Sequence, residues 1–465
     1  MKSPTTRSEG IEAVEHQLLP SVMIEGQRST SSMAEALEEH NVPAVSVAVI
    51  AEGRIEWAHA WGRTTADGSL ANSETLFQSC SISKPVAALT TLRLVASGAL
   101  DLDADVDSLL RSWHIPDNPH TAGNPVTPRW LMSHRAGFNV RGFPGYAIGS
   151  QVPTLGQILR GEPPANTDAL QVETAPGTAF RYSGGGTQVL QQLLEDLSGL
   201  PYSDLAKREV LDVAEMTVST YEPSPEAAAF GHLASGEPME GGYGIQPELA
   251  AAGLWSTPSD LAGLAISMQR AYADDGGIIP RQLARAALTP VGDGPTGLGF
   301  FLESDGDRLR FSHNGGNTGF RCHLEAYASL GLGAAVMTNS DNGQILVNRI
   351  FNTIADTYGW PGFLTERKVV SVGQEVLDRY SGSYLLRLDE APDGIPIKVA
   401  VGDGLLTFES PLGPGKLLAE SETRFFGTQL PVEVEFHRED GQASGFTLVF
   451  GGTTTMEATR TDLQP

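Results

Sequence analysis

The apolar periodicity of this chain changes once, at Trp360-Pro361-Gly362. Before that point, stretches with helical spacing alternate with short runs of strand-forming residues. After it, helical spacing disappears and short alternating runs follow one another, separated by residues that favour turns. This pattern predicts a small all-β barrel or sandwich over residues 366–465. The chain has 465 residues, too many for one small core, so more than one structural unit is expected.

The order of elements in the first part predicts an α+β fold. Val45–Ile50 and Arg54–Ala58 flank Ala51-Glu52-Gly53 and predict a β-hairpin. Further strand-like runs lie at 299–303, 309–312, 322–327 and 333–338, and helical spacing lies at 81–97, 187–197, 202–211, 258–272 and 345–358. The hairpin and the later strands can share one antiparallel sheet, with helices beside it and in a separate helical lobe. We therefore expect an N-terminal arm at 1–30, a sheet-and-helix domain at 31–365 and a barrel domain at 366–465.

Composition excludes several classes of partner. The formal charge is −25, which repels phosphate backbones and anionic membrane faces, so we expect no nucleic-acid partner. No run approaches the roughly 18 apolar residues of a membrane helix, and the first residues lack the apolar core of a signal peptide. We expect no membrane insertion and a cytoplasmic location. Cys80 and Cys322 are the two cysteines, too few for a disulfide framework.

The first candidate for chemistry is Ser81-Ile82-Ser83-Lys84, at the start of a predicted helix. A serine and a lysine three apart lie on one helix face, so the amine can reach the hydroxyl. Unpaired N–H groups at the helix start would favour developing negative charge on the serine. The pattern therefore predicts a nucleophile with its own base, although the motif by itself also arises by chance.

Two later segments add to this candidate. In Arg181-Tyr182-Ser183-Gly184 the glycine permits a tight turn, and Tyr182 can exchange a proton with a serine when a lysine lies nearby. In His313-Asn314-Gly315-Gly316, after a strand, the glycines allow a substrate to lie against the strand edge, and backbone N–H groups can face an oxyanion.

Other chemistries lack their motifs. The chain has no Gly-x-Ser-x-Gly elbow and no His-Glu-x-x-His zinc motif, and His313 with His323 lacks a third ligand, so no metal and no cofactor are expected. Gly413-Pro414-Gly415-Lys416 has Ser410 where a P-loop needs its first glycine. We interpret that segment as a turn.

In their order, the three segments resemble the serine β-lactamase and penicillin-binding-protein superfamily, especially its class C-like esterases, D-aminopeptidases and D,D-carboxypeptidases. The resemblance covers roughly residues 31–360 and extends to segments 130–138, 142–146 and 252–261. It implies a β-lactamase-like fold. The terminal barrel is similar to lipocalin-like modules appended to some of these hydrolases. Such a module can cover or shape the active-site cleft, or it can be a stabilising or dimer-forming appendage. A homodimer is therefore one option for this chain.

The resemblance also implies roles for individual residues. Ser81 would be the acylated nucleophile, Lys84 its base and Tyr182 the residue that relays a proton to the leaving group. His313 would take the place of the lysine in the family's Lys-Thr-Gly motif. The N–H groups of Ser81 and Gly316 would form the oxyanion hole. Gly184, Asn314 and Gly315 complete the predicted substrate-binding positions.

Two departures from the family pattern shape the expected substrate. Gly184 replaces the asparagine of Tyr-x-Asn, and His313 replaces a permanent cation with a group largely neutral at pH 7. Both changes argue against a working β-lactamase. Esters or D-amino-acid amides and peptides fit the altered site better. The alternatives are acyl or peptidyl transfer at the same site, and a penicillin-binding ligand sensor without turnover.

Overall fold

The computed structural model describes residues 6–64, 68–306, 308–388, 391–410, 413–429, 432–439, 441–450 and 454–461. Residues 1–5 of the predicted arm and the last four residues of the predicted barrel domain, 462–465, lie outside the described residues. The chain forms two compact units, one of Met1–Glu15 and Ser32–Val347 and one of His16–Ser31 and Asn348–Pro465. The expected limits lay between residues 30 and 31 and between residues 365 and 366. The observed ones differ because His16–Ser31 and the residues from Asn348 to 365 group with the barrel.

Hydrogen bonds explain this grouping. Strand β1 (Met23–Ile24) pairs in parallel with β10 (Glu366–Arg367). The Arg349 side chain donates to the carbonyl of Leu19 at 3.1 Å and to the hydroxyl of Ser31 at 2.6 Å. The segment after the first helix, α1 (Arg7–His16), is thus tied to residues that follow Val347.

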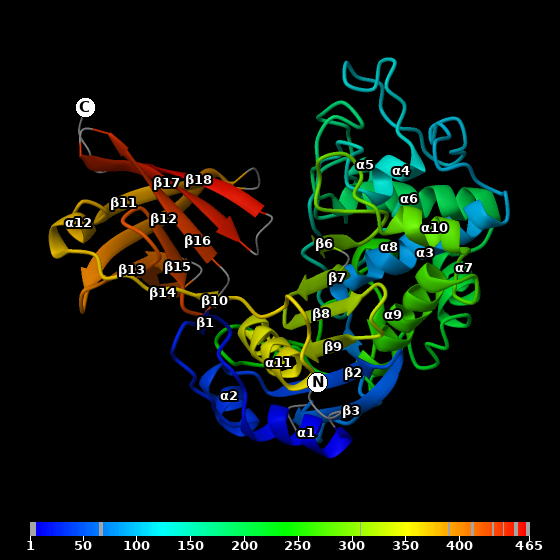
Figure 1. Ribbon diagram of the computed structural model, residues 1–465. Coiled ribbons are helices and arrows are strands. Elements are labelled where there is room, and N and C mark those ends of the chain that lie inside the picture. Colours follow the sequence, from blue (N-terminus) through cyan, green and yellow to red (C-terminus); the bar gives the residue numbers. More distant parts are fainter. Residues whose placement is uncertain are drawn as a thin grey trace. The chain divides into compact units, whose positions relative to one another are not determined.

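The first unit is built on a six-stranded antiparallel sheet with the order β3-β2-β9-β8-β7-β6. Its strands are β2 (Ala44–Ala51), β3 (Arg54–Gly62), β6 (Phe301–Asp305), β7 (Arg308–Asn317), β8 (Phe320–Tyr327) and β9 (Gly333–Thr338). Figure 1 shows these strands side by side. The predicted hairpin is β2 and β3, and β2 also pairs with β9, so the two ends of this part of the chain share one sheet as expected. The α+β fold class is confirmed.

Helices surround this sheet and form the lobe beside it. Helix α9 (Pro258–Ala273) packs on β2, β3, β8 and β9. Helix α3 (Ser83–Ala96) is buried from Ser83 to Leu92, and it packs against α4 (Pro128–Met132), α6 (Gly184–Ser198) and α8 (Leu249–Ala252), as Figure 1 shows. Other helices and short strands of this unit are α2 (Met33–Glu39), α5 (Leu155–Arg160), α7 (Tyr202–Ala206), the π-helix Lys207–Leu211 that follows α7, α10 (Arg281–Ala287), β4 (Phe77–Gln78) and β5 (Trp255–Ser256). Helix α11 (Gly343–Tyr358) corresponds to the predicted helix at 345–358.

The second unit contains a closed eight-stranded barrel, as the alternating runs predicted. Its strands are β11 (Gly382–Leu388), β12 (Ala391–Gly402), β13 (Leu405–Ser410), β14 (Gly413–Ala419), β15 (Arg424–Gly427), β16 (Val432–Glu439), β17 (Gln442–Phe450) and β18 (Thr454–Arg460), and a short helix, α12 (Gln374–Asp378), precedes them. Tyr380, Tyr384, Phe436 and Phe446 fill its core with rings in contact.

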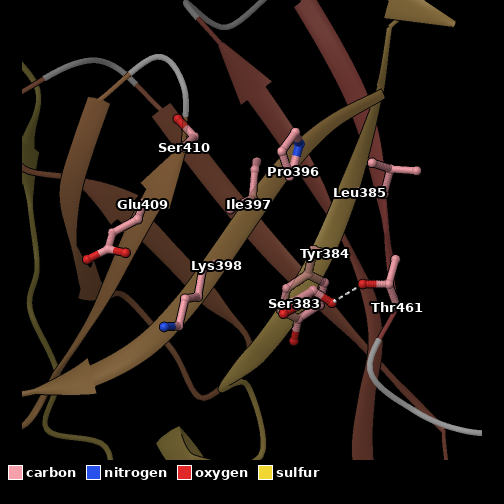
Figure 2. A pocket seen from close by; sticks show the side chains of 9 residues that line it. All are labelled: Ser383, Tyr384, Leu385, Pro396, Ile397, Lys398, Glu409, Ser410 and Thr461. Atoms are coloured by element: carbon pink, nitrogen blue, oxygen red, sulfur yellow. Dashed lines mark hydrogen bonds between the residues drawn. The ribbon is translucent and has the colours of Figure 1, made fainter. Parts of the chain in front are cut away.

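The barrel has a hollow of about 380 Å³ among β11, β12 and β13. Lys398 and Glu409, which are paired positions on β12 and β13, line it, and Thr461 Oγ1 donates to the carbonyl of Ser383 at its edge over 3.1 Å (Figure 2). All residues lining this hollow belong to the second unit, whereas the residues predicted to carry chemistry belong to the first.

The prediction of a turn at Gly413-Pro414-Gly415-Lys416 is wrong, because these residues lie in β14. Pro414 is tolerated where β14 has one neighbour, since β15 pairs with Leu417–Ala419 further along. Gly415 is needed for packing, because an added Cβ would lie 2.2 Å from the Phe408 ring opposite.

Candidate active site

Ser81 lies in a tight turn that packing holds in place. The 3₁₀ turn Cys80–Ile82 connects β4 to α3, so the α-helix starts at Ser83, two residues later than the sequence predicts. Ser83 Oγ donates to the Cys80 carbonyl (2.6 Å) and accepts from the Leu254 N–H (3.0 Å). Cys80 has φ of +50°, an uncommon conformation for a residue with a side chain, which costs about 1–3 kcal/mol and persists only when its surroundings hold it.

The structure brings Ser81 and Lys84 together. Lys84 Nζ donates to Ser81 Oγ at 3.0 Å and to the carbonyl of Ala251 at 2.9 Å. Lys84 is 5% exposed, whereas Ser81 is only partly buried. The hydroxyl can therefore meet a substrate while the amine beneath it stays fixed by two oxygen partners.

Strand β7 runs against the turn that carries Ser81. The strand continues to Asn317, so His313-Asn314-Gly315-Gly316 lies within it and does not close it as the sequence suggested. A Cβ on Gly315 would lie 2.6 Å from the Ser79 carbonyl and 2.9 Å from Cys80 Cβ. Glycine at 315 therefore allows the strand to approach the nucleophile turn.

Alternate residues of this strand face opposite ways. His313, Gly315 and Asn317 are buried, whereas Asn314 and Gly316 are exposed. The Asn314 side chain is thus on the other face of the strand from His313. Asn317, which sequence reasoning missed, donates from Nδ2 to Gln78 Oε1 (2.6 Å) and ties β7 to β4.

His313 is a neutral imidazole with one unused nitrogen. Its Nδ1 lies 2.6 Å from the Asn314 carbonyl, which can only accept, so the proton is on Nδ1. Its Nε2 is buried with no hydrogen-bond partner among the described residues. Burial, reinforced by the Lys84 charge, lowers the pKa of His313 to about 3. The free lone pair of Nε2 is therefore an acceptor at neutral pH.

Tyr182 lies in a group of aromatic rings next to Lys84. Lys84 Nζ is 5.1 Å from the centre of the Tyr182 ring. The ring is 4.4 Å from that of His134 and 6.2 Å from those of Phe301 and His313. The structure thus brings the four predicted residues together. Ser81 and Tyr182 both lie next to Lys84, and His313 lies next to Tyr182.

His134 is a further residue of this group. Its Nδ1 accepts the Ser183 N–H at 3.2 Å, directly after Tyr182. Burial, together with the charge of Lys84, holds the pKa of His134 well below its usual range. The segment 130–138 resembled the family in sequence, but nothing in the sequence indicated that this side chain stacks on Tyr182.

Gly184 is explained by the loop that precedes α6. A Cβ at this position would lie 2.8 Å from Phe143 Cε2 and 3.1 Å from the Arg141 carbonyl. The Gly184 N–H donates to that same carbonyl at 3.0 Å. The loop through Arg141 and Phe143 therefore occupies the space into which a side chain at 184 would point.

No group of three or more His, Cys, Asp or Glu side chains in the described ranges could hold a metal ion. Among the helices the structure describes, none is long and apolar enough to span a membrane.

Comparison with known families gives one extended match. The family model described as Beta-lactamase matches residues 30–353, which include Ser81, Lys84, Tyr182 and His313.

Two individual relatives match over most of this chain. Penicillin-binding protein 4* of Bacillus subtilis (strain 168) is 26% identical over 430 residues, which cover 84% of this chain and 88% of the relative. A D-aminopeptidase of Gluconobacter oxydans (strain 621H) is 25% identical over 380 residues, 78% of this chain and 68% of the relative.

Solved structures share the fold. The octameric penicillin-binding protein homologue from Pyrococcus abyssi matches with a TM-score of 0.59 at 18% identity, covering 92% of this chain and 98% of that one. D-amino acid amidase from Ochrobactrum anthropi SV3 matches with a TM-score of 0.57 at 21% identity, over 70% of this chain and 95% of that one.

Proposed function

This chain belongs to the Beta-lactamase family and is a serine hydrolase, and we propose that Ser81 forms an acyl-enzyme with esters or with amides and short peptides of D-amino acids. The observation that carries this proposal is the 3.0 Å hydrogen bond between Lys84 Nζ and Ser81 Oγ, with Ser81 partly exposed and the lysine buried. A nucleophile within hydrogen-bond reach of its base is the arrangement that acyl transfer requires.

In the first half-reaction, Ser81 Oγ attacks the carbonyl carbon of the substrate, and its proton passes to Lys84, which acts as the base in its neutral amine form and becomes an ammonium. The N–H groups of Ser81 and Gly316 would bind the oxyanion, and preorganised donors of this kind often supply the largest share of stabilisation. The bond to the leaving group then breaks, its electron pair stays on the leaving atom, and the proton held by Lys84 passes to that atom through Tyr182. Water attacks the acyl-enzyme in the second half-reaction and restores the Ser81 hydroxyl.

His313 argues against one kind of substrate group. A neutral imidazole gives no charge to hold a carboxylate, unlike a lysine at this position. The names of two relatives, D-aminopeptidase and D-amino acid amidase, agree with amide substrates of D-amino acids. Both observations support D-amino-acid amides and esters over β-lactams.

The proposal is tested by intact-mass detection of an acyl adduct. Wild-type protein mixed with p-nitrophenyl acetate should gain one acetyl group, and Ser81→Ala should gain none. Ser79→Ala is a matched control, because Ser79 Oγ is buried two residues away with no hydrogen-bond partner among the described residues. This control should acylate like the wild type, and equal labelling of Ser81→Ala would contradict the proposal.

A turnover screen then addresses the substrate. Short-chain esters, D- and L-amino-acid amides and a β-lactam are compared on wild type and Ser81→Ala. We expect turnover of esters and D-amino-acid amides that Ser81→Ala abolishes, with slow or no β-lactam hydrolysis. Faster turnover of the β-lactam than of every ester and amide would overturn the proposed substrate class.

A further inference from the structure

Both cysteines of the chain lie beside the turn that carries the nucleophile. Cys80 directly precedes Ser81, and Cys322 lies on β8, far away in the sequence. Both are free thiols and fully buried. Burial raises the pKa of the Cys322 thiol well above its usual range, and the neighbouring Cys80 side chain raises it further. The fold therefore gathers the two thiols of the chain into one buried space.

Gly315 shows how close together the two cysteine side chains lie. It is paired with Cys322 across β7 and β8. A Cβ built on Gly315 would lie 2.4 Å from Cys322 Sγ and 2.9 Å from Cys80 Cβ. Both cysteines thus border the small space that a side chain at 315 would fill. A disulfide needs Cβ atoms about 3.5–4.5 Å apart, and side chains that meet at one point can reach that separation by rotation and small shifts.

Neither sulfur has a strong hydrogen-bond partner. Cys80 Sγ donates to the Gln78 carbonyl at 3.3 Å, and Cys322 Sγ donates to the Ser79 carbonyl at 3.1 Å. These carbonyls belong to the residues that lead into the nucleophile turn. Because an S–H group is a weak donor, little is given up when a bond between the sulfurs replaces these two hydrogen bonds.

We propose that Cys80 and Cys322 form a disulfide when the chain folds under oxidising conditions, and that this bond ties the Ser81 turn to β8. The inference does not depend on the substrate of Ser81. Because both sulfurs are buried in the folded protein, a small oxidant meets them while the chain is still folding. The same burial then shields the finished bond from reductants.

The oxidant is a low-molecular-weight disulfide such as oxidised glutathione. The thiolate of one cysteine attacks a sulfur of the small disulfide, and one small thiol leaves. As the chain folds, the second cysteine attacks the mixed disulfide at the first, and the second small thiol leaves. The protein gives up two protons and two electrons, and the oxidant takes up both as its S–S bond becomes two thiols.

The position of the bond explains its effect. The Ser81 N–H directly follows Cys80, and Gly316 is paired with Arg321, next to Cys322. The disulfide would therefore link the two segments whose N–H groups are predicted to bind the oxyanion. It would also hold Cys80 at its φ of +50°, a conformation that the surroundings have to maintain. A crosslink between residues so far apart in sequence restricts the unfolded chain strongly.

The first test counts thiols. The full chain is produced in a bacterial host with an oxidising cytoplasm and in one with a reducing cytoplasm, denatured in N-ethylmaleimide and weighed intact. We expect a monomer without maleimide from the oxidising host, which gains two maleimides once it is reduced, and two maleimides on the chain from the reducing host. Cys322→Ala is the control, because it has one cysteine and cannot form the internal bond. Two maleimides on the wild type from both hosts overturn the proposal, as does a glutathione adduct or a disulfide-linked dimer as the main product.

The second test measures what the bond holds. Five of the six tryptophans belong to the first unit, so their fluorescence reports its unfolding in urea. The oxidised protein should unfold at a urea concentration higher by about 0.5 M or more than the reduced protein. For Cys322→Ala the two hosts should give the same midpoint. Equal midpoints for oxidised and reduced wild type would overturn the stabilising role of the bond, and neither result bears on whether Ser81 is acylated.

Discussion

Gly315 and Cys322 face each other across β7 and β8, and the thiol leaves no room for a side chain on the glycine. An added Cβ would lie 2.4 Å from Cys322 Sγ. Cys322 Sγ in turn donates to the carbonyl of Ser79 at 3.1 Å, two residues before the nucleophile. The separation of β7 from the Ser81 turn is therefore fixed by packing around one glycine.

Gly315→Ala should consequently weaken both stability and activity. Overpacking in a dense core costs about 1–3 kcal/mol, and we expect a loss of that size in the free energy of unfolding, with slower acylation of Ser81. Urea unfolding and p-nitrophenyl acetate hydrolysis measure the two effects. Gly316→Ala is the stability control, since a Cβ there meets nothing nearer than Arg321 at 3.5 Å. Equal stability of the two variants would show that β7 can move away from the turn.

Lys84→Ala should reduce turnover by about 10² or more, the usual effect of losing a general base. The substitution removes both hydrogen bonds of Nζ and leaves the Ala251 carbonyl without this donor. A loss of stability of about 1–3 kcal/mol is therefore expected as well. Single-turnover acylation, measured where the variant is fully folded, separates the two effects. A near-normal acylation rate would remove Lys84 from the mechanism.

Tyr182→Phe should reduce turnover by a similar factor of about 10² and leave stability almost unchanged. The ring contacts with His134, Phe301 and His313 do not need the hydroxyl. Because the leaving group depends on proton delivery, amides should lose more rate than activated esters. Rates on one amide and on p-nitrophenyl acetate provide the measurement, and an equal small loss on both would exclude Tyr182 as the proton relay.

His313 should make stability depend on pH. Its pKa of about 3 lies below the roughly 6.5 of an exposed histidine, so between these values the unfolded chain binds a proton that the folded protein does not. This contribution is complete above pH 6.5 and decreases by about 1.4 kcal/mol per pH unit as the pH falls toward 3. In urea unfolding from pH 8 to pH 4, the free energy of unfolding of the wild type should therefore fall relative to that of His313→Gln. A constant difference would contradict a neutral buried His313.

Local patterns were enough to predict some elements and not others. The hairpin around Gly53 and the spacing of Ser81 and Lys84 depend on neighbours in the chain, and the structure has both. The proximity of Gly184 to the Phe143 loop depends on segments about 40 residues apart, and the strand position of Gly415 depends on Phe408 across the barrel. Such contacts leave no periodic signal in the sequence. From the sequence alone, a glycine that packing requires is therefore interpreted as a turn residue, or as a position that has lost a functional side chain.

Glu248 is the clearest buried charge outside the proposed mechanism. It is 0% exposed, and neither carboxylate oxygen has a hydrogen-bond partner among the described residues. Burial raises its pKa to about 7. It precedes α8, whose Ala251 carbonyl accepts from Lys84, so its ionisation acts on a segment that supports the site.

Glu248→Gln should therefore stabilise the protein at high pH. The folded pKa lies above the value of about 4.3 for an exposed glutamate, so the folded protein holds a proton that the unfolded chain loses between these values. Stability conferred by the protonated form is present below pH 4.3 and is lost as the pH rises through 7. We expect wild type and variant to be similar near pH 4 and the variant to be about 3 kcal/mol more stable at pH 8. Glu237→Gln, at an exposed site, controls for the loss of one charge. A difference between Glu248→Gln and wild type that did not change with pH would mean that the buried carboxylate is compensated by a cation.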